Sequence, residues 1–278
     1  MRYAYPAPAK LNLFLHVVGR RADGYHLLQS VFRLIDRADT VHLALRDDGR
    51  VVREGDLPGV AEEDDLTVRA ARLLQGHAPP GLGVSIRLDK NLPLGGGLGG
   101  GSSDAATVLL ALNRLWQVNL PRETLQKLAL QLGADVPVFV FGQTAFAEGV
   151  GEVLHPVSAP PAWYVVLMPP VQVPTAAIFA APELTRNTPA LKIAPFSAGM
   201  GHNDLQSVVI NRYPEVARHL AWLAQFGDAR MTGSGACVFA SFGTEDAARN
   251  VLHQLPETMQ GFVAQGLDKH PLYDFCAG

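Results

Sequence analysis

Six glycines within the seven positions Gly95–Gly101 are the feature that most restricts how this chain can fold. Ser102 and Ser103 follow them, at the start of an apolar segment typical of a buried helix. A loop without side chains exposes its backbone N–H groups, here at the positive end of a helix dipole. A tight turn does not need six glycines, and flexible surface loops rarely adjoin a buried helix. The run therefore predicts a binding site for a polyphosphate.

Two common phosphate-binding motifs do not account for this glycine run. A Walker P-loop ends in Gly-Lys-Ser/Thr, and no lysine precedes Ser102. Gly95, Gly97 and Gly100 match the spacing G-x-G-x-x-G of dinucleotide-binding folds. That fold also needs a strand ending in an acidic residue about 20 residues later, and the region 116–122 leads into another expected helix instead. Both motifs are therefore disfavoured.

Composition narrows the class of protein further. Apolar residues make up 48% of the 278 residues, so a large core can form, and the net charge of −3 argues against a general nucleic-acid binder. Two cysteines without a CxxC motif suit a reducing cytoplasm, and nine histidines without paired spacing predict no histidine-built metal site. The N-terminus is a poor signal peptide, and prolines interrupt the most apolar later stretch. We expect a cytoplasmic protein without a nucleic-acid or membrane partner.

Hydrophobic patterns predict two α+β domains, about 1–157 and 158–278, joined at the proline-rich stretch 156–161. Alternating apolar residues predict strands over 9–18, 41–46, 82–89, 138–141, 145–148 and 163–168, and a strand–turn–strand unit over 230–242. Helical spacing predicts helices from a cap at Asp64 or Asp65 to Gln75, from a cap at Ser102 or Ser103 to Trp116, from Pro121 to Gly133, from Pro214 to Gly227, and after a cap at Thr244.

The first strand, 9–18, combines an apolar face with a partly polar one. Strict alternation puts Leu11, Leu13, Leu15 and Val17 on the first face, and Lys10, Asn12, Phe14 and His16 on the second. A lysine and an asparagine therefore lie side by side near the start of the strand.

Four segments together resemble the GHMP kinases, the family of galactokinase, homoserine kinase, mevalonate kinase and phosphomevalonate kinase. They are PAPAKLNLFLHVVGRRADGYH, PLGGGLGGGSSDAA, GADVPVFVFGQTAFAEGVGE and MTGSGACVFA, and the resemblance covers essentially the whole chain. It implies a two-domain α+β architecture with the active site in the interdomain cleft. It also implies an enzyme that transfers a phosphoryl group from ATP, as its Mg²⁺ complex, to a small-molecule alcohol.

The segment RADGYH and the extra glycines resemble one branch of this family. In that branch the acceptor is a small alcohol joined to cytidine diphosphate, phosphorylated on its C2 hydroxyl. A kinase of homoserine or mevalonate is the first alternative, and these two segments disfavour it. A non-catalytic binding protein on the same fold is the second alternative. Such a relative would be expected to lose the catalytic base or the glycine loop, and both are present in this sequence.

The resemblance implies two catalytic residues, Lys10 and Asp135. Asp135 would accept or orient the proton of the acceptor hydroxyl, and Lys10 would stabilise the charge of Asp135 and of the transferred group. From the residues alone, Asp135 is equally well a turn former and Lys10 a solvated strand end. The implied ATP-binding residues are Pro93, Leu94, Gly95, Gly96, Gly97, Leu98, Gly99, Gly100, Gly101, Ser102 and Ser103, with Asp65, Leu66 and Lys90 on the adenine side. Ser103 would bind phosphate or magnesium or only cap the helix, and Asp104 is a helix-start charge rather than a metal ligand; the metal ligands stay unassigned.

The implied acceptor-binding residues are Asn12, Tyr25, His26, Thr175, Phe179, Gly233, Ser234 and Gly235. Tyr25 and Phe179 would sandwich the pyrimidine ring, and His26 would read its polar edge. Asn12 would hydrogen-bond the alcohol, and Thr175 would contact the pyrophosphate. Without the resemblance, Phe179 would be interpreted as a core residue, and an ordinary hairpin turn is the alternative at 233–235.

Overall fold

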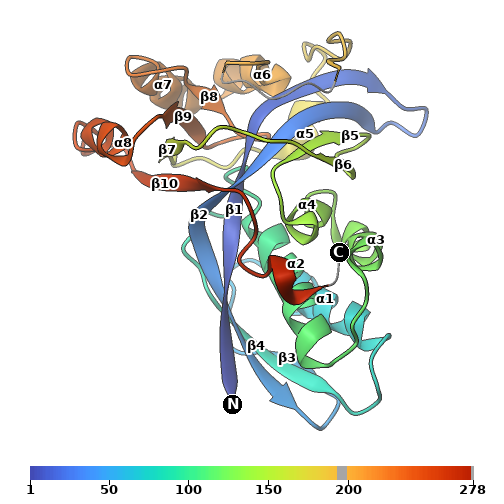
Figure 1. Cartoon of the computed structure of the whole chain (residues 1–278). Helices are drawn as coiled ribbons and strands as arrows, with labels where there is room; N and C mark the ends of the chain where they lie inside the picture. The colour runs from blue at the N-terminus through green and yellow to red at the C-terminus, as the bar shows by residue number, and fades with distance from the viewer. Residues whose placement is uncertain (193–198, 277–278) are drawn as a thin grey trace.

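Two long antiparallel strands, β1 (Arg2–Arg20) and β2 (His26–Arg46), run the length of the molecule and connect its two halves (Figure 1). The computed structural model describes residues 1–192 and 199–276. The sequence predicted only the parts 9–18 and 41–46 of these strands. Charged residues interrupt the alternation of β2, and one of them, Arg33, is nevertheless buried. Pairing along the whole of β1 and β2 therefore overrides the local pattern.

The other strands extend this pair into a single ten-stranded sheet. Its order is β3-β4-β2-β10-β7-β9-β8, with β1 paired to β2 and with β5 paired to β2 and β6. The added strands are β3 (Val51–Arg53), β4 (Gly83–Asp89), β5 (Ala145–Glu148), β6 (Val153–Pro156), β7 (Trp163–Leu167), β8 (Arg230–Met231), β9 (Val238–Phe242) and β10 (Gly261–Leu267).

Helices pack in two groups, one in each half of the molecule (Figure 1). The lower group is α1 (Leu66–Gln75), α2 (Gly100–Leu115), α3 (Arg122–Leu132) and α4 (Val136–Phe141), and the upper group is α5 (Thr175–Phe179), α6 (Asp204–Arg212), α7 (Pro214–Leu223) and α8 (Glu245–Leu252). The predicted caps at Asp65 and Thr244 are confirmed, because each side chain accepts a hydrogen bond from a backbone N–H of its helix. α7 ends at Leu223, about one turn before the predicted end at Gly227.

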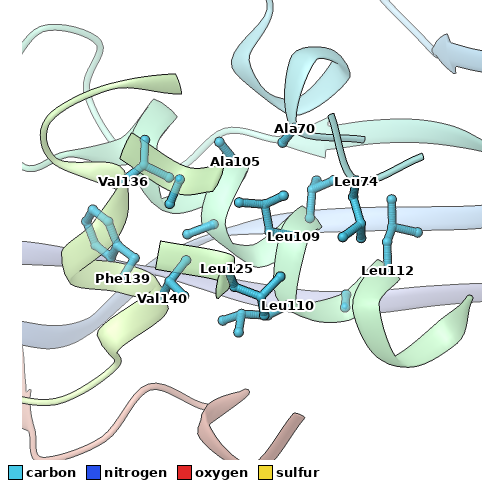
Figure 2. Packing of buried hydrophobic residues seen from close by; sticks show 14 of the residues in the cluster. Ala70, Leu74, Ala105, Leu109, Leu110, Leu112, Leu125, Val136, Phe139 and Val140 are labelled. Atoms are coloured by element: carbon cyan, nitrogen blue, oxygen red, sulfur yellow. The ribbon is translucent and has the colours of Figure 1, made fainter. Parts of the chain in front are cut away.

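The predicted strand at 138–141 is wrong, because these residues belong to helix α4. The segment Val-Pro-Val-Phe-Val-Phe is rich in β-formers, but Pro137 in its first turn favours a helix start. Val136, Phe139 and Val140 then pack in the same cluster as the side chains of α2 (Figure 2). Burial against α2 outweighs the intrinsic strand preference of this short segment.

Helix α2 lies at the centre of the lower half and is buried on all sides from Ser103 to Asn113. Leu109, Leu110 and Leu112 contact residues of α1, α3 and α4 in one hydrophobic cluster (Figure 2). The prediction of a deeply buried helix directly after the glycine run is confirmed. The loop that precedes α2 is thereby attached directly to the buried core of the lower half.

A β-bulge in β1 changes which residues share a face. Asn12 pairs with Phe32 and Phe14 with Val31, so Leu13 is an extra residue without a partner on β2. The strict alternation predicted for 9–18 is therefore wrong beyond Asn12. Leu15, rather than Phe14, lines the main cavity together with Lys10 and Asn12.

The sheet connects the two halves of the molecule, because strands from distant parts of the chain pair with each other. β6 ends at Pro156 and pairs within the part of the sheet next to β2, whereas β7 begins at Trp163 and pairs with β9 and β10. β10 also pairs with β2, and the C-terminal 3₁₀ turn η1 (Tyr273–Phe275) is followed by Cys276, which is buried in the α2 cluster. A domain boundary at 157/158 stays a prediction.

Candidate active site

One open cavity of about 900 Å³ lies between the two halves of the chain, and its walls come from both. The first half contributes β1, the start of β2 and the glycine loop, and the second half contributes α5 and the turn after β8. The cavity brings together these sequence-predicted residues: Lys10, Asn12, Tyr25, His26, Leu66, Lys90, Pro93, Leu94, Gly95, Gly96, Gly97, Gly99, Gly100, Gly101, Ser102, Asp135, Thr175, Phe179, Gly233 and Ser234.

Four predicted residues lie behind the cavity wall. Asp65 caps α1 and pairs with Arg53, and Leu98 is buried with its carbonyl accepting from the backbone of β1. The hydroxyl of Ser103 is fully buried and donates to the carbonyl of Pro8 at 2.7 Å. Gly235 donates its N–H to the carbonyl of Thr232. Direct ligand contacts by these four residues stay predictions, and the structure gives each a role in holding the wall.

The glycine loop leads directly into α2 without a capping side chain. The helix begins at Gly100 with Gly99 as its N-cap, so the predicted cap at Ser102 or Ser103 is wrong. Gly97 and Gly99 have φ of +77° and +73°, a region that residues with a Cβ rarely adopt. A Cβ on Gly97 would lie 2.3 Å from the carbonyl oxygen of Thr232. The loop thus needs glycine for close backbone packing, and it leaves the helix N-terminus open to an anionic ligand.

Lys10 and Asp135 meet at the foot of this loop. Lys10 is only 2% exposed, and its Nζ donates to Asn12 Oδ1 at 2.6 Å and to the carbonyl of Gly97 at 2.9 Å. The Asp135 Oδ2 lies 3.5 Å from the same nitrogen, and the Asp135 side chain is 44% exposed at the start of α4. The lysine is therefore held in one orientation between the glycine loop and an exposed carboxylate.

Asn12 continues the hydrogen-bond chain away from the lysine. Its Nδ2 donates to Ser30 Oγ at 2.8 Å, and Ser30 Oγ donates to the carbonyl of Phe14 at 2.6 Å. The backbone N–H of Asn12 donates to Thr232 Oγ1 at 2.9 Å, which connects β1 to the turn after β8. With its carbonyl occupied by Lys10, the amide of Asn12 has a fixed orientation. These hydrogen bonds fix the side chains beside Asp135, so that they could stabilise a charge that develops there or a proton transfer.

The far end of the cavity carries aromatic side chains. The ring centroids of His26 and Phe179 lie 5.1 Å apart, and the rings stack with an interplanar angle of 30°. Tyr25, the residue before His26, also lines the cavity and is 65% exposed. Thr175 Oγ1 and Ser234 Oγ lie 2.6 Å apart, so the start of α5 touches the turn 233–235. A planar aromatic ligand can stack here while its polar extension reaches the hydroxyls.

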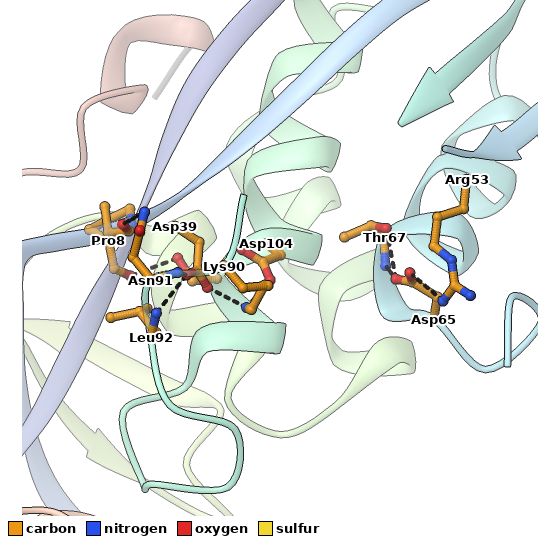
Figure 3. A network of polar contacts seen from close by, with 11 residues as sticks. Pro8, Asp39, Arg53, Asp65, Thr67, Lys90, Asn91, Leu92 and Asp104 are labelled. Atoms are coloured by element: carbon orange, nitrogen blue, oxygen red, sulfur yellow. Dashed lines mark hydrogen bonds and ion pairs between the residues drawn. The ribbon is translucent and has the colours of Figure 1, made fainter. Parts of the chain in front are cut away.

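A buried ion-pair network under the glycine loop was not predicted from the sequence. Lys90 Nζ pairs with Asp104 Oδ2 at 2.6 Å and with Asp39, whose other oxygen accepts from the backbone of Asn91 and Leu92 (Figure 3). Burial raises the pKa of Asp104 to about 7, although the ammonium of Lys90 opposes this effect. Asp104 therefore pairs with Lys90 near the start of α2, and is not a solvent-exposed charge at the helix start.

Several residues of the cavity wall were not predicted from the sequence. Arg20, Ser30, Val150, Gly151 and Leu205 line the cavity. Val150 and Gly151 lie in the hairpin between β5 and β6, where two glycines two residues apart were a signal for an exposed turn. The other three gave no local signal, because their position depends on how distant strands and helices meet.

No group of three or more His, Cys, Asp or Glu side chains within 1–192 and 199–276 is arranged to hold a metal ion. Within the same residues, no helix is both long and apolar enough to cross a membrane. The oxygen donors that line the cavity include the Ser102 hydroxyl and the Asp135 carboxylate.

The fold is that of the GHMP kinases, and the chain belongs to this family. Residues 65–143 match the family model for the GHMP kinases N terminal domain, and residues 184–261 match the model for the GHMP kinases C terminal part. A solved mevalonate kinase superposes with a TM-score of 0.70 over 96% of this chain and 100% of its own, at 16% identity, which shows a common fold. The predicted α+β GHMP-kinase architecture is confirmed, and membership of the family implies use of ATP.

Within the family, two curated relatives that match over nearly the whole of both chains have the same name. The 4-diphosphocytidyl-2-C-methyl-D-erythritol kinase of Thiobacillus denitrificans is 84% identical over 99% of both chains. The enzyme of the same name from Nitrosospira multiformis is 64% identical over 97% of this chain and 93% of its own. A solved 4-(cytidine 5'-diphospho)-2C-methyl-D-erythritol kinase has a TM-score of 0.80 and 35% identity, covering 95% of this chain and 99% of that one.

Proposed function

We propose that the chain phosphorylates the C2 hydroxyl of 4-diphosphocytidyl-2-C-methyl-D-erythritol with ATP, giving the 2-phosphate and ADP. One observation carries the proposal: a single cavity joins the Lys10–Asp135 pair and the glycine loop to the His26–Phe179 stack. The first set of residues suits phosphoryl transfer and the second suits a nucleobase. Relatives of high identity that carry this name support the same conclusion. The reaction belongs to non-mevalonate isoprenoid precursor biosynthesis, in the cytoplasm.

ATP is proposed to bind with its phosphates along the loop 95–101 and the open N-terminus of α2. The exposed N–H groups and the helix dipole there favour a polyphosphate anion. Leu66 and Lys90 line the adjoining wall and would face the adenosine part. We propose that Mg²⁺ enters as the ATP complex, where it would neutralise charge on the phosphates. Mg²⁺ prefers oxygen ligands and keeps several from water and phosphate, and the Ser102 hydroxyl and the Asp135 carboxylate are oxygen donors of the cavity wall that could add to them.

The transfer itself needs positioning and stabilisation of charge. The acceptor oxygen would attack the γ-phosphorus while its proton passes to, or is oriented by, Asp135. The bond to the bridging oxygen breaks, and its electron pair leaves with ADP. Lys10, held by Asn12 and the Gly97 carbonyl, would stabilise the negative charge on the transferred group. Tyr25, His26 and Phe179 would bind the cytosine, and Thr175 with Ser234 the pyrophosphate.

The test is ADP release with three alcohols in parallel: the cytidyl substrate, homoserine and mevalonate. We expect turnover with the first alone. Turnover preferring either of the others would contradict the substrate assignment while leaving a kinase. No ADP release with any alcohol, combined with intact ATP binding, would favour a non-catalytic binding protein instead.

A further inference from the structure

Arg186 was singled out by no motif, yet it lies between helix α5 and His26. Its Nε lies 3.1 Å from His26 Nε2, and its Nη1 donates to the carbonyl of Leu184 at 3.0 Å. Its Nη2 donates to the carbonyls of Phe179 and Ala181 at 3.0 and 2.6 Å, at the C-terminal end of α5. Three backbone carbonyls therefore fix the plane of the guanidinium, and with it the direction in which Nε points.

This contact determines the tautomer of His26. A guanidinium has donors and no acceptor, so His26 Nε2 must supply the lone pair and the ring proton must lie on Nδ1. Burial, together with the positive charges of Arg186 and Arg20, lowers the pKa of His26, which favours the neutral ring. His26 lines the cavity, and within residues 1–192 and 199–276 no side chain or backbone group accepts a hydrogen bond from its Nδ1. An N–H donor is thus left for a ligand.

We propose that Arg186 is a positioning residue that holds His26 as an Nδ1–H donor, and that this makes the site select cytosine over uracil. The inference rests on the proposed function, because it assumes that a cytidine nucleotide stacks beside His26 and Phe179. The two pyrimidines differ at N3, which is an acceptor in cytosine and an N–H donor in uracil. A fixed donor on the protein pairs with the first and opposes the second. Discrimination of this kind is strong, because the wrong base leaves polar groups unpaired.

The experiment compares Arg186→Met with Arg212→Met as a matched control. Arg212 also touches α5, through the carbonyl of Ala177 and an ion pair with Glu183, but no hydrogen bond connects it to His26. Dissociation constants for CDP and UDP are measured by calorimetry. We expect Arg186→Met to weaken CDP by about tenfold or more while UDP changes little, so that the preference falls. Arg212→Met should keep the wild-type ratio, and the KM for ATP should stay the same in both variants.

A second measurement uses the wild-type protein and does not depend on the folding of any variant. The ¹⁵N shifts of the His26 imidazole in the wild-type protein report its tautomer, and we expect a proton on Nδ1 alone. A ring protonated on Nε2 would overturn the proposal, as would equal loss of CDP and UDP in Arg186→Met, since Arg186 would then only hold α5. If the wild type turns over the cytidyl substrate but binds CDP and UDP equally, this inference fails and the proposed function stands. Absence of turnover would instead refute the proposed function.

Discussion

Replacing Gly97 by alanine tests how the glycine loop holds Lys10, the proposed catalytic lysine. The Gly97 carbonyl accepts from Lys10 Nζ at 2.9 Å, and a Cβ on this residue would lie 2.3 Å from the Thr232 carbonyl oxygen and 3.1 Å from that of Gly235. Gly95 provides a matched control, because its φ of +70° is close to the +77° of Gly97 but nothing lies within 4 Å of its Cβ position. The two substitutions therefore share backbone strain and differ in steric overlap.

The magnitudes follow from this difference. A left-handed φ costs an alanine about 1–2 kcal/mol at either position. Overlap with a backbone carbonyl forces the loop away from the turn 232–235, which adds roughly 1–3 kcal/mol for Gly97→Ala. We expect the free energy of unfolding to fall by about 1–2 kcal/mol for Gly95→Ala and about 2–5 kcal/mol for Gly97→Ala. Because the Gly97 carbonyl moves with the loop, Lys10 loses a hydrogen-bond partner, and kcat should fall on the order of 10²-fold.

Urea unfolding and steady-state kinetics measure both effects. Gly97→Ala should also raise the KM for ATP far more than the KM for the acceptor, since the loop is the proposed phosphate site. If Gly97→Ala were as stable as Gly95→Ala and kept the wild-type kcat, the contact between the loop and the turn 232–235 would not hold Lys10. If only acceptor affinity fell, the loop would bind the other substrate.

Three further predictions follow from the site. Asp135→Asn should lower kcat on the order of 10²-fold or more while ATP binding stays measurable by calorimetry, and a near wild-type kcat would exclude Asp135 from the mechanism. Tyr25→Ala and Phe179→Ala should each cost about 1–3 kcal/mol of CDP binding relative to Arg249→Ala on exposed α8, and equal affinities would refute the stacking. Burial raises the pKa of Asp104 to about 7, so the folded state binds a proton that the unfolded chain, at 3.8, releases. The contribution of Asp104 to the unfolding free energy should therefore fall as the pH rises from 3.8 to about 7, and Asp104→Asn should make the slope measured in urea titrations less negative or more positive; an unchanged slope would contradict the shifted pKa.

Local chemistry made part of the site predictable from the sequence. The glycine run before an apolar segment predicted an anion site at a helix start, and α2 begins there. Thr175 and Phe179 were expected among the acceptor-binding residues, and both lie on α5 and line the cavity. Such features depend on a few neighbouring residues: the missing side chain of glycine, helical spacing and the dipole of a helix end. The family followed from the order of four such segments.

Tertiary structure decided the contacts between these segments. The bulge at Leu13 moves Leu15 to the cavity face, and only the pairing of β1 with β2 shows it. The pattern at 138–141 predicted a strand, because β-branched residues favour strands and the local sequence does not show that this segment packs against α2. The same holds for the buried charges: Asp39, Lys90 and Asp104 each look solvated in the sequence.

The sequence alone determined that a glycine loop precedes a buried helix and that the chain belongs among kinases of one fold. The family resemblance implied that Lys10 acts on Asp135, but only the tertiary structure shows the 3.5 Å between them and the contact of Arg186 with His26. The physical reason is that hydrogen bonds and ion pairs between distant residues depend on strand register and helix packing, which the burial of the whole core fixes. Motif spacing is local, whereas the orientation of a donor within 3.1 Å of an imidazole is a property of the assembled fold.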